Sequence, residues 1–281
     1  MAKKQNTEPK YFVSKINTQV LNYRVYVMSP TERLIYFTLL FAAGGAVGLI
    51  FYGGLFKSGG QSTLLTYISN AVVFVAAGAL VLKNVLPILT KSLLKKRSEK
   101  LKKQFCDFAS ALTNALASGM NMNDSLLAAA KDLQAQYSEE AFIVREVQEI
   151  INGIQNNIPV ETMLEDFGSR SGIPDIVNFA TVFATCYRTG GDIKSIVRRT
   201  TDIISEKIMI SSEIETAMTS NKMQMNVMCV LPIVIVFMMR TMSSQFADSF
   251  ATIIGVIGLT ISAGLTIAAY KLGQKITDIK G

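Results

Sequence analysis

The sequence contains no histidine and no tryptophan, and only three cysteines among its 281 residues. Histidine is the commonest metal ligand and the usual general base near neutral pH. Its absence excludes Ser-His-Asp hydrolases, His-ligated zinc sites and haem held by histidine. The cysteines, Cys106, Cys186 and Cys229, form no C-x-x-C pair and predict neither a disulfide framework nor a thiolate metal site. We therefore expect no metal and no cofactor.

Motifs for nucleotide binding and for acid–base catalysis are also scarce. The segment from Gly190 to Ser195 is the nearest imitation of a phosphate-binding P-loop, but it lacks the leading glycine and the correct spacing. It is better explained as the end of one helix followed by the cap of the next. The acidic pair Glu139-Glu140 could act as a general acid and base, but more simply it opens a helix and complements the helix dipole. No catalytic residues are expected, and the protein is predicted not to be an enzyme.

Charged residues make up only 17% of the chain, against roughly 25% in soluble domains. Four long stretches contain no charge: 34–56, 58–82, 223–239 and 249–270, the second being apolar mainly from Leu64. A helix needs about 20 apolar residues to cross the hydrocarbon layer, and Pro232 is tolerable inside such a helix. The sequence therefore predicts an integral membrane protein with four transmembrane helices.

Basic residues flank these stretches unevenly. Lysine and arginine gather before the first, after the second and after the fourth, whereas the two hairpin loops offer only Lys57 and Arg240. Positively charged flanks stay on the cytoplasmic side. The N-terminus, the central region and the C-terminus are therefore all expected in the cytoplasm.

The net charge of +7 follows from the same arrangement. Residues 91–222 contain 16 basic and 17 acidic residues, so the positive surplus lies in the flanks of the spans. A nucleic-acid patch is one interpretation of a basic chain. Cations that face anionic membrane lipid explain it more simply, so lipid and not nucleic acid is the expected partner.

Helical periodicity runs through residues 91–222. Apolar residues recur at steps of three and four in 101–116 and again in 193–208, and no stretch alternates with period two for long enough to form a strand. Helix stop signals stand at Gly119, Gly153, Gly172 and Gly190-Gly191, and start signals at Asn121 or Asn123, Pro159, Pro174 and Asp192. They divide this region into about six helices, most simply three antiparallel pairs in one bundle. The predicted fold class is all-α.

The N-terminal segment has helical spacing as well. Its apolar residues, Phe12, Ile16, Val20, Tyr23 and Val27, would share one face of an amphipathic helix lying on the membrane or on the central domain. The expected organisation is then a cytoplasmic N-terminal segment (1–33), two spans (34–90), a cytoplasmic helical domain (91–222), two more spans (223–272) and a cytoplasmic tail (273–281). A short external loop joins the two spans of each pair.

Small residues recur at four-residue steps in the spans, where they let helices approach closely. The candidate packing residues are Gly44, Gly48, Ala251, Gly255, Gly258 and Ser262. They favour packing within the chain, and self-association is the alternative.

Three local motifs resemble a known family. Residues 115–126 are similar to its "L-x-x-G-h-x-h-x-x-A-L" segment, with Ser125 where alanine is usual. The stretch from Gly153 to Leu164 resembles a second such segment, and 188–193 resembles its "E-x-x-G-x-L" turn. With the order of spans, they resemble the TadB/TadC-like branch of the type II secretion F and type IV pilus platform family. Arg188 stands where many relatives carry glutamate, so an acidic contact cannot be transferred to it.

The resemblance implies a non-enzymatic platform in the cytoplasmic (inner) membrane. Such a platform couples a cytoplasmic assembly ATPase to pilin extraction and filament assembly, with pilin, a second platform protein or a second copy of itself as further partners. Loops carry recognition more often than bundle interiors. The candidate partner-binding residues are Gly119, Asn121, Asn123, Asp124, Arg188, Gly190, Gly191, Asp192 and Lys194. The alternatives are helix capping at these turns, a polytopic transporter or channel, and a membrane-anchored helical adaptor.

Overall fold

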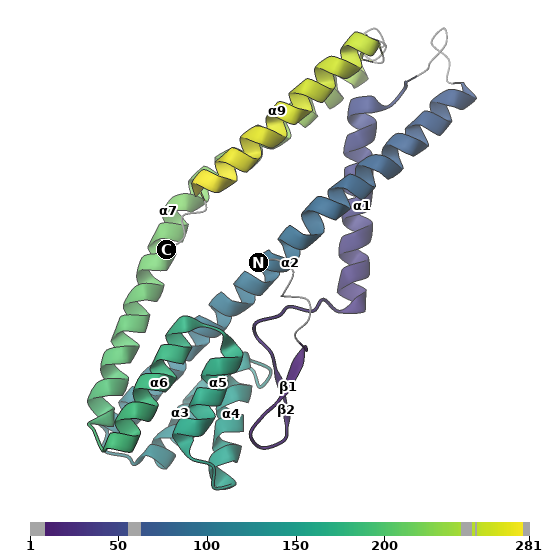
Figure 1. Ribbon diagram of the computed structural model, residues 1–281. Coiled ribbons are helices and arrows are strands. Elements are labelled where there is room, and N and C mark those ends of the chain that lie inside the picture. The colour runs from purple at the N-terminus through teal and green to yellow at the C-terminus, as the bar shows by residue number, and fades with distance from the viewer. Residues whose placement is uncertain (1–8, 56–62, 243–248, 251, 278–281) are drawn as a thin grey trace. The chain divides into compact units, whose positions relative to one another are not determined.

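The computed structural model describes residues 9–55, 63–242, 249, 250 and 252–277. Two short strands are followed by long and short helices (Figure 1). Their bounds in chain order are β1 Tyr11–Val13, β2 Gln19–Leu21, α1 Pro30–Tyr52, α2 Leu64–Ala117, α3 Met122–Gln136, α4 Phe142–Gln155, α5 Val160–Ser171, α6 Pro174–Thr189, α7 Ile193–Met242 and α9 Ile253–Thr277.

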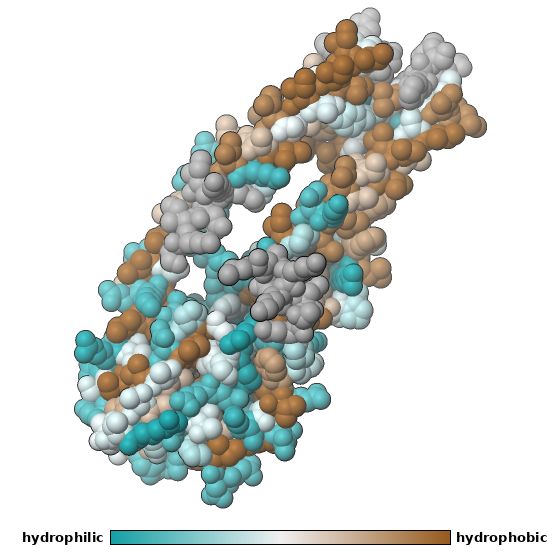
Figure 2. Space-filling model, viewed as in Figure 1, coloured by the Kyte–Doolittle hydropathy of each residue, from teal (hydrophilic) through white to brown (hydrophobic). Residues whose placement is uncertain are grey.

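These elements form two compact units. The bundle unit comprises the chain up to Val27 together with Thr90–Ile210, and the apolar unit comprises Met28–Leu89 and the chain from Ser211 onward. α2 and α7 contribute residues to both units, because they are continuous helices of 54 and 50 residues. Figure 2 shows mostly hydrophobic atoms over the helices of the apolar unit and mixed, largely hydrophilic atoms over the bundle unit.

Four helices, α1, α2, α7 and α9, are long and apolar enough to cross a membrane. Together with the almost complete absence of sheet among the described residues, they confirm the predicted all-α membrane protein with four spans. The structure also shows that the second span and the first bundle helix are one helix. The expected boundary between the second span and the helical domain, at residues 90 and 91, falls inside α2. No glycine occurs between Leu82 and Ala117, and Pro87 lies within the helix.

Glycine makes the close approach of α1 and α2 possible in the apolar unit. A Cβ atom on Gly48 would lie 2.5 Å from the Cβ of Ala77, and one on Gly45 would lie 2.3 Å from the ring of Phe74. Such distances are well inside van der Waals contact, so only residues without a side chain fit there. A capping box begins α1, with the backbone N–H of Ser29 donating to Glu32 Oε2 at 3.1 Å.

Several predicted capping residues also end or begin the helices of the bundle unit, whereas Gly153, predicted as a stop, lies inside α4. Gly172 and Gly190 have φ values of +64° and +71° at the ends of α5 and α6, the left-handed region that glycine enters without steric cost. Pro174 is the first residue of α6. Glu139-Glu140 were expected to open the next helix, but α4 begins at Phe142 with Ala141 as its cap. The two glutamates lie in the preceding turn, which is closed by the Ala141 N–H donating to the Ser138 carbonyl at 2.9 Å.

Aromatic side chains from three helices form the centre of the bundle unit. Phe105 on α2 is fully buried and packs against Phe179 of α6, with ring centroids 5.1 Å apart, and against Phe167 of α5, at 6.1 Å. Both arrangements are angled, with interplanar angles of 82° and 52°, as aromatic pairs prefer. This core joins helices that lie about 60 residues apart or more along the chain.

Asp175 in the first turn of α6 ties three helices together. Its carboxylate accepts from Lys102 Nζ of α2 at 2.7 Å and from Lys207 Nζ of α7 at 2.9 Å. Partial burial alone would raise the pKa of Asp175, but the two ammonium groups lower it below its usual range. The carboxylate is therefore held ionised between two charged donors.

The predicted N-terminal amphipathic helix is wrong. Residues 11–13 and 19–21 instead form an antiparallel hairpin in which Phe12 pairs with Val20. Asn17 adopts φ +59° in the connecting turn, a conformation that asparagine tolerates. The spacing of eight between Phe12 and Val20 suits one face of a helix and equally suits a cross-strand pair, so spacing alone did not separate the two structures.

The hairpin docks on α4 through buried polar contacts. Ser14 Oγ donates to Glu149 Oε1 at 2.6 Å, and Thr18 Oγ1 donates to the same oxygen. A few residues later, the Tyr23 hydroxyl donates to Glu146 Oε1 at 2.9 Å. Burial, followed by the nearby Glu146 carboxylate, raises the pKa of Tyr23, so this hydroxyl keeps its proton. The N-terminal segment is therefore part of the bundle unit.

Candidate functional sites

The turn between α2 and α3 is held by its own side chains. Gly119 has φ +85°, and no heavy atom of the described chain lies within 4 Å of where its Cβ would be. Asn121 caps α3 by accepting the Asp124 N–H at 2.9 Å, and its amide donates to Asp124 Oδ2 at 2.7 Å. Asn123 is exposed in the first turn of α3. The polar residues predicted to bind a partner thus serve helix capping as well.

The turn between α6 and α7 is built in the same way. The Gly191 N–H donates to the Cys186 carbonyl at 3.0 Å, and Asp192 Oδ1 accepts the Ser195 N–H at 3.1 Å, which caps α7. Arg188 is exposed, and among the described residues its side chain makes only a long ion pair, 3.5 Å, with Glu165 of α5. Its guanidinium therefore remains available to a partner.

Lys194 links the two turns. Its Nζ donates to the carbonyl of Ala117, the last residue of α2, at 3.1 Å. Both predicted partner-binding turns consequently lie at the same end of the bundle unit, which the sequence alone did not establish (Figure 1).

A polar cleft of about 350 Å³ adjoins this contact, between α2 and α7. α2 lines it with Ser110, Thr113, Asn114 and Ala117, and α7 lines it with Lys194, Arg198, Thr201 and Asp202. On its floor Thr113 and Thr201 hydroxyls lie 3.4 Å apart, and Thr201 is buried. The cleft thus offers hydroxyl, amide, cationic and anionic groups along two facing helices.

Lys194 is the only one of these cleft residues that the sequence motifs predicted. Ser110 and Asn114, like Arg198 and Asp202, are spaced by four and so share a face of their helix. Two short polar stripes on otherwise amphipathic helices are a weak signal, because most such stripes are solvated surface. Only the pairing of α2 with α7 makes them one site.

A neighbouring carboxylate of α2 is already engaged. Asp107, one turn before Ser110, accepts the hydroxyl of Tyr137, the residue that ends α3. Burial, followed by this hydrogen bond, raises the pKa of Tyr137 to about 12. The contact therefore fastens the end of α3 to α2 at ordinary pH.

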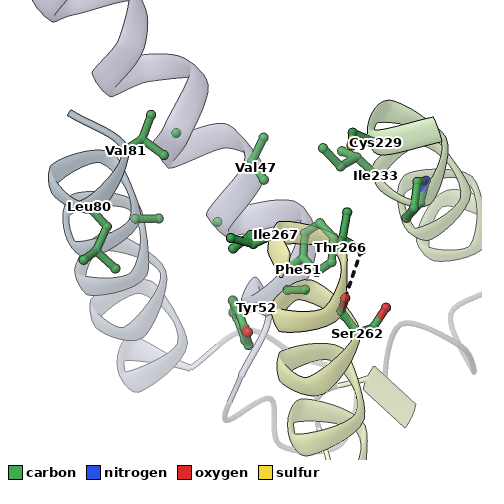
Figure 3. Close-up of a pocket in the computed structure, with 15 residues that line it drawn as sticks. Val47, Phe51, Tyr52, Leu80, Val81, Cys229, Ile233, Ser262, Thr266 and Ile267 are labelled. Atoms are coloured by element: carbon green, nitrogen blue, oxygen red, sulfur yellow. Dashed lines mark hydrogen bonds between the residues drawn. The ribbon is translucent and has the colours of Figure 1, made fainter. Parts of the chain in front are cut away.

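A second cavity lies among the four apolar helices of the apolar unit (Figure 3). It measures about 270 Å³ and is lined by uncharged residues, with Val47 and Phe51 from α1, Leu80 from α2, Ile233 from α7 and Ile267 from α9 among them. The few polar groups include Ser262, whose carbonyl accepts the Thr266 hydroxyl at 2.9 Å. This cavity suits an apolar occupant.

The predicted packing residues fall into different environments. Gly44 and Gly48 face α2. Both also line the apolar cavity, and so does Ser262. A Cβ on Gly255 would meet the carbonyl oxygen of Ser249 at 2.3 Å, whereas Gly258 has no described heavy atom within 4 Å. The sixth candidate, Ala251, lies outside the described residues.

Among the residues that the structure describes, no group of three or more histidine, cysteine, aspartate or glutamate side chains could hold a metal ion. Cys106 and Cys186 are buried and Cys229 is partly buried; all three are free thiols.

The fold and these sites define a class, that of helical membrane proteins with a bundle between two pairs of spans. Residues 108–240 match the family model of type II secretion system protein F, from the C-terminal part of α2 to the end of the third span. This match covers just under half of the chain, and the matched part is similar to type II secretion system protein F. No curated protein and no solved structure matches the chain.

Proposed function

We propose that this protein is the inner-membrane platform of a type IV or Tad-like pilus, or of a type II secretion machine. It couples a cytoplasmic assembly ATPase to the extraction of pilin from the bilayer and to filament assembly. The observation that carries this proposal is the family match over residues 108–240, which includes all of α3 to α6.

The continuity of α2 and α7 supports a coupling role. Each helix has residues in the bundle unit and in the apolar unit, so main-chain hydrogen bonds run without a loop from one to the other. A movement imposed on the bundle by an ATPase is thereby transmitted to two spans. Pro87 lies in α2 two residues before Leu89, where the apolar unit ends, and its missing N–H makes this a point where the helix bends most easily.

The distribution of charge supports a cytoplasmic bundle unit and cytoplasmic termini. Lysine and arginine flank the spans on that side, and the outer hairpins carry only Lys57 and Arg240. Arg240 is moreover used inside the apolar unit, where it donates to the carbonyl oxygens of Leu49, Phe51 and Gly53 at 3.2, 3.1 and 2.8 Å. Its positive charge completes the C-terminal end of α1.

The partners of this proposal are the assembly ATPase, pilin, and a second platform protein or a second copy of the chain. The ATPase would meet the two turns joined by Lys194, through Gly119, Asn123, Asp124 and Arg188. Membrane lipid surrounds the four spans.

The test is a pulldown of the tagged full-length protein from membranes of the producing cell, together with deletion of its gene. The proposal expects the assembly ATPase and pilin to co-purify and filaments to disappear in the deletion strain. Normal filaments and secretion in that strain would contradict it. Saturable solute flux in liposomes containing the purified protein, with normal filaments in the deletion strain, would favour a transporter instead.

A further inference from the structure

We propose that the polar cleft between α2 and α7 is the seat of an acidic segment of a protein partner, with one aspartate or glutamate side chain bound at Arg198. This deepens the proposed function, on which it rests in naming the partner as the assembly ATPase.

Three contacts establish how the two helices face each other along the cleft. Ala117 meets Lys194, Thr113 meets Thr201, and Cys106 Sγ lies 3.2 Å from Ser205 Oγ. Residue numbers rise on α7 as they fall on α2, so the helices run antiparallel.

This register divides the cleft into two ends. Asn114 lies level with Arg198, next to Lys194, and Ser110 lies level with Asp202. One end therefore offers cations and an amide, and the other offers a hydroxyl and a carboxylate.

The side chains at the cationic end are open to a ligand. Arg198 and Asn114 are exposed, and neither makes a side-chain hydrogen bond or ion pair within the described chain. The Lys194 ammonium donates one of its three N–H groups to the Ala117 carbonyl, which leaves two donors for a ligand. Guanidinium, ammonium and amide donors converging on one point suit a carboxylate, which guanidinium binds with two parallel hydrogen bonds.

Most other acids around this end are already engaged. Asp192 accepts the N–H of Ser195, and Asp124 accepts the amide of Asn121. Asp107, beyond Ser110 at the opposite end, accepts the hydroxyl of Tyr137. These carboxylates already accept hydrogen bonds within the bundle unit, and none of them pairs with Arg198. The unsatisfied charge at this end of the cleft is therefore positive.

The opposite end argues for a peptide over a simple anion. In a cleft of 350 Å³, inorganic phosphate bound at Arg198 would lie close to the Asp202 carboxylate, which would repel it. A peptide presents both a carboxylate and backbone N–H donors, so it can satisfy Arg198 at one end and Asp202 with Ser110 at the other. Because only α2 and α7 line the cleft, a small ligand would stay half exposed, whereas a protein surface would cover it.

The surroundings of the cleft also suit a protein interface. Met120, three residues after Ala117, is 45% exposed in the adjoining turn. Arginine and methionine are enriched in protein interfaces relative to the rest of the surface. The cleft with this turn thus combines a charged anchor and an apolar rim.

The first test uses fluorescein-labelled decaglutamate as the probe and the full-length protein in nanodiscs, followed by fluorescence anisotropy. We expect decaglutamate to bind and decaglutamine not to bind. Arg198→Glu should weaken binding at least tenfold. Arg199→Glu, the matched control on the exposed neighbouring residue that does not line the cleft, should change it less than twofold.

Arg198→Gln removes the charge without reversing it and should weaken binding about fivefold or more, with an unchanged circular dichroism spectrum. Equal binding of decaglutamate to the wild type and both Arg198 variants overturns the inference. Failure of decaglutamate to bind the wild type overturns it too. If inorganic phosphate binds at the cleft instead, the seat serves a small anion.

A second arm uses the purified assembly ATPase. Binding that is lost in Arg198→Glu and kept in Arg199→Glu supports the inference. An ATPase that binds all three proteins equally refutes the inference while the proposed function stands. If the ATPase does not bind even the wild type, but decaglutamate binds in an Arg198-dependent manner, the proposed partner is wrong and the acidic-segment seat remains.

Discussion

Arg170 and Glu146 form a bidentate ion pair inside the bundle unit, with Nη1 and Nη2 of the guanidinium 3.0 and 2.8 Å from the two carboxylate oxygens. Both side chains are at most 5% exposed. Arg170 Nε also donates to Asp166 at 2.7 Å, and Tyr23 donates to Glu146, so the network joins α5, α4 and the N-terminal segment. Its donors and acceptors satisfy each other, which a buried charge requires.

Arg170→Met should destabilise the bundle unit by about 3 to 5 kcal/mol, because it leaves the Glu146 carboxylate buried without its cation. Denaturant unfolding of the full-length protein in detergent micelles, with amide hydrogen exchange of α4 and α5, measures this loss. Arg188→Met is the control: its pair with Glu165 is long and exposed, so it should change stability by less than about 0.5 kcal/mol. Equal effects of the two substitutions would rule out a structural role for the buried network.

Asp175→Asn should destabilise the bundle unit by about 1 to 2 kcal/mol at neutral pH, because the amide cannot accept two charge-assisted hydrogen bonds from Lys102 and Lys207. The pKa of Asp175 is lowered in the folded state, whereas an unfolded aspartate titrates at about 3.9. Its contribution is therefore complete well above pH 4 and is lost as the pH falls through the lower folded value.

The measurement is denaturant unfolding of the wild type and Asp175→Asn between pH 7 and pH 2. The difference between the two proteins should shrink only below about pH 4. A difference that stays constant down to pH 2 would show that the Asp175 carboxylate does not contribute through its charge.

Gly48→Ala should destabilise the pairing of α1 with α2 by about 1 to 3 kcal/mol, since its Cβ would come within 2.5 Å of the Cβ of Ala77 and neither methyl can move aside. Gly258→Ala is the matched control in another apolar helix, where no described heavy atom lies near the new methyl. It should be neutral, or stabilising by up to about 1 kcal/mol through helix propensity. Thermal unfolding in micelles compares the two. If Gly258→Ala proves the more damaging, α9 has a packing partner that the chain itself does not supply.

Arg240→Met should loosen the end of α1, because three carbonyl oxygens lose the Arg240 donor at once and the Leu49 carbonyl is left with the Gly53 N–H. Cys229 lines the adjoining apolar cavity and reports such opening. Its alkylation by N-ethylmaleimide, followed by mass spectrometry, should accelerate about tenfold, the ratio expected if opening becomes easier by about 1.4 kcal/mol. Arg33→Met, at the exposed start of α1, should leave the rate unchanged. An unchanged rate in Arg240→Met would mean that these hydrogen bonds do not limit opening.

Much of the architecture follows from local signals. Charge-free stretches predict the spans because an unpaired charge is costly in hydrocarbon. Helix ends are predicted by residues that act locally. Asn121 and Asp192 accept main-chain N–H groups at helix starts, and Gly190 adopts the left-handed dihedral angles at a helix end. These features need no knowledge of what lies elsewhere in the chain.

Other features depend on contacts between distant residues. The N-terminal hairpin is held by Glu149, and Tyr23 just after it by Glu146, both more than 120 residues away. The spacing of the hairpin residues favoured a helix equally well. Between the apolar and charged parts of α2 the sequence has no glycine and one helix-breaking residue, Pro87, which did not end the helix.

The amino-acid sequence by itself determined that the chain has four apolar spans and a helical middle region, because hydrophobicity and helix capping act over a few neighbouring residues. Only the tertiary structure decided that Lys194 reaches Ala117, that Arg198 stands level with Asn114, and that Arg170 finds Glu146. Such pairs depend on how helices far apart in sequence are aligned, and that alignment is set by the packing of the whole core.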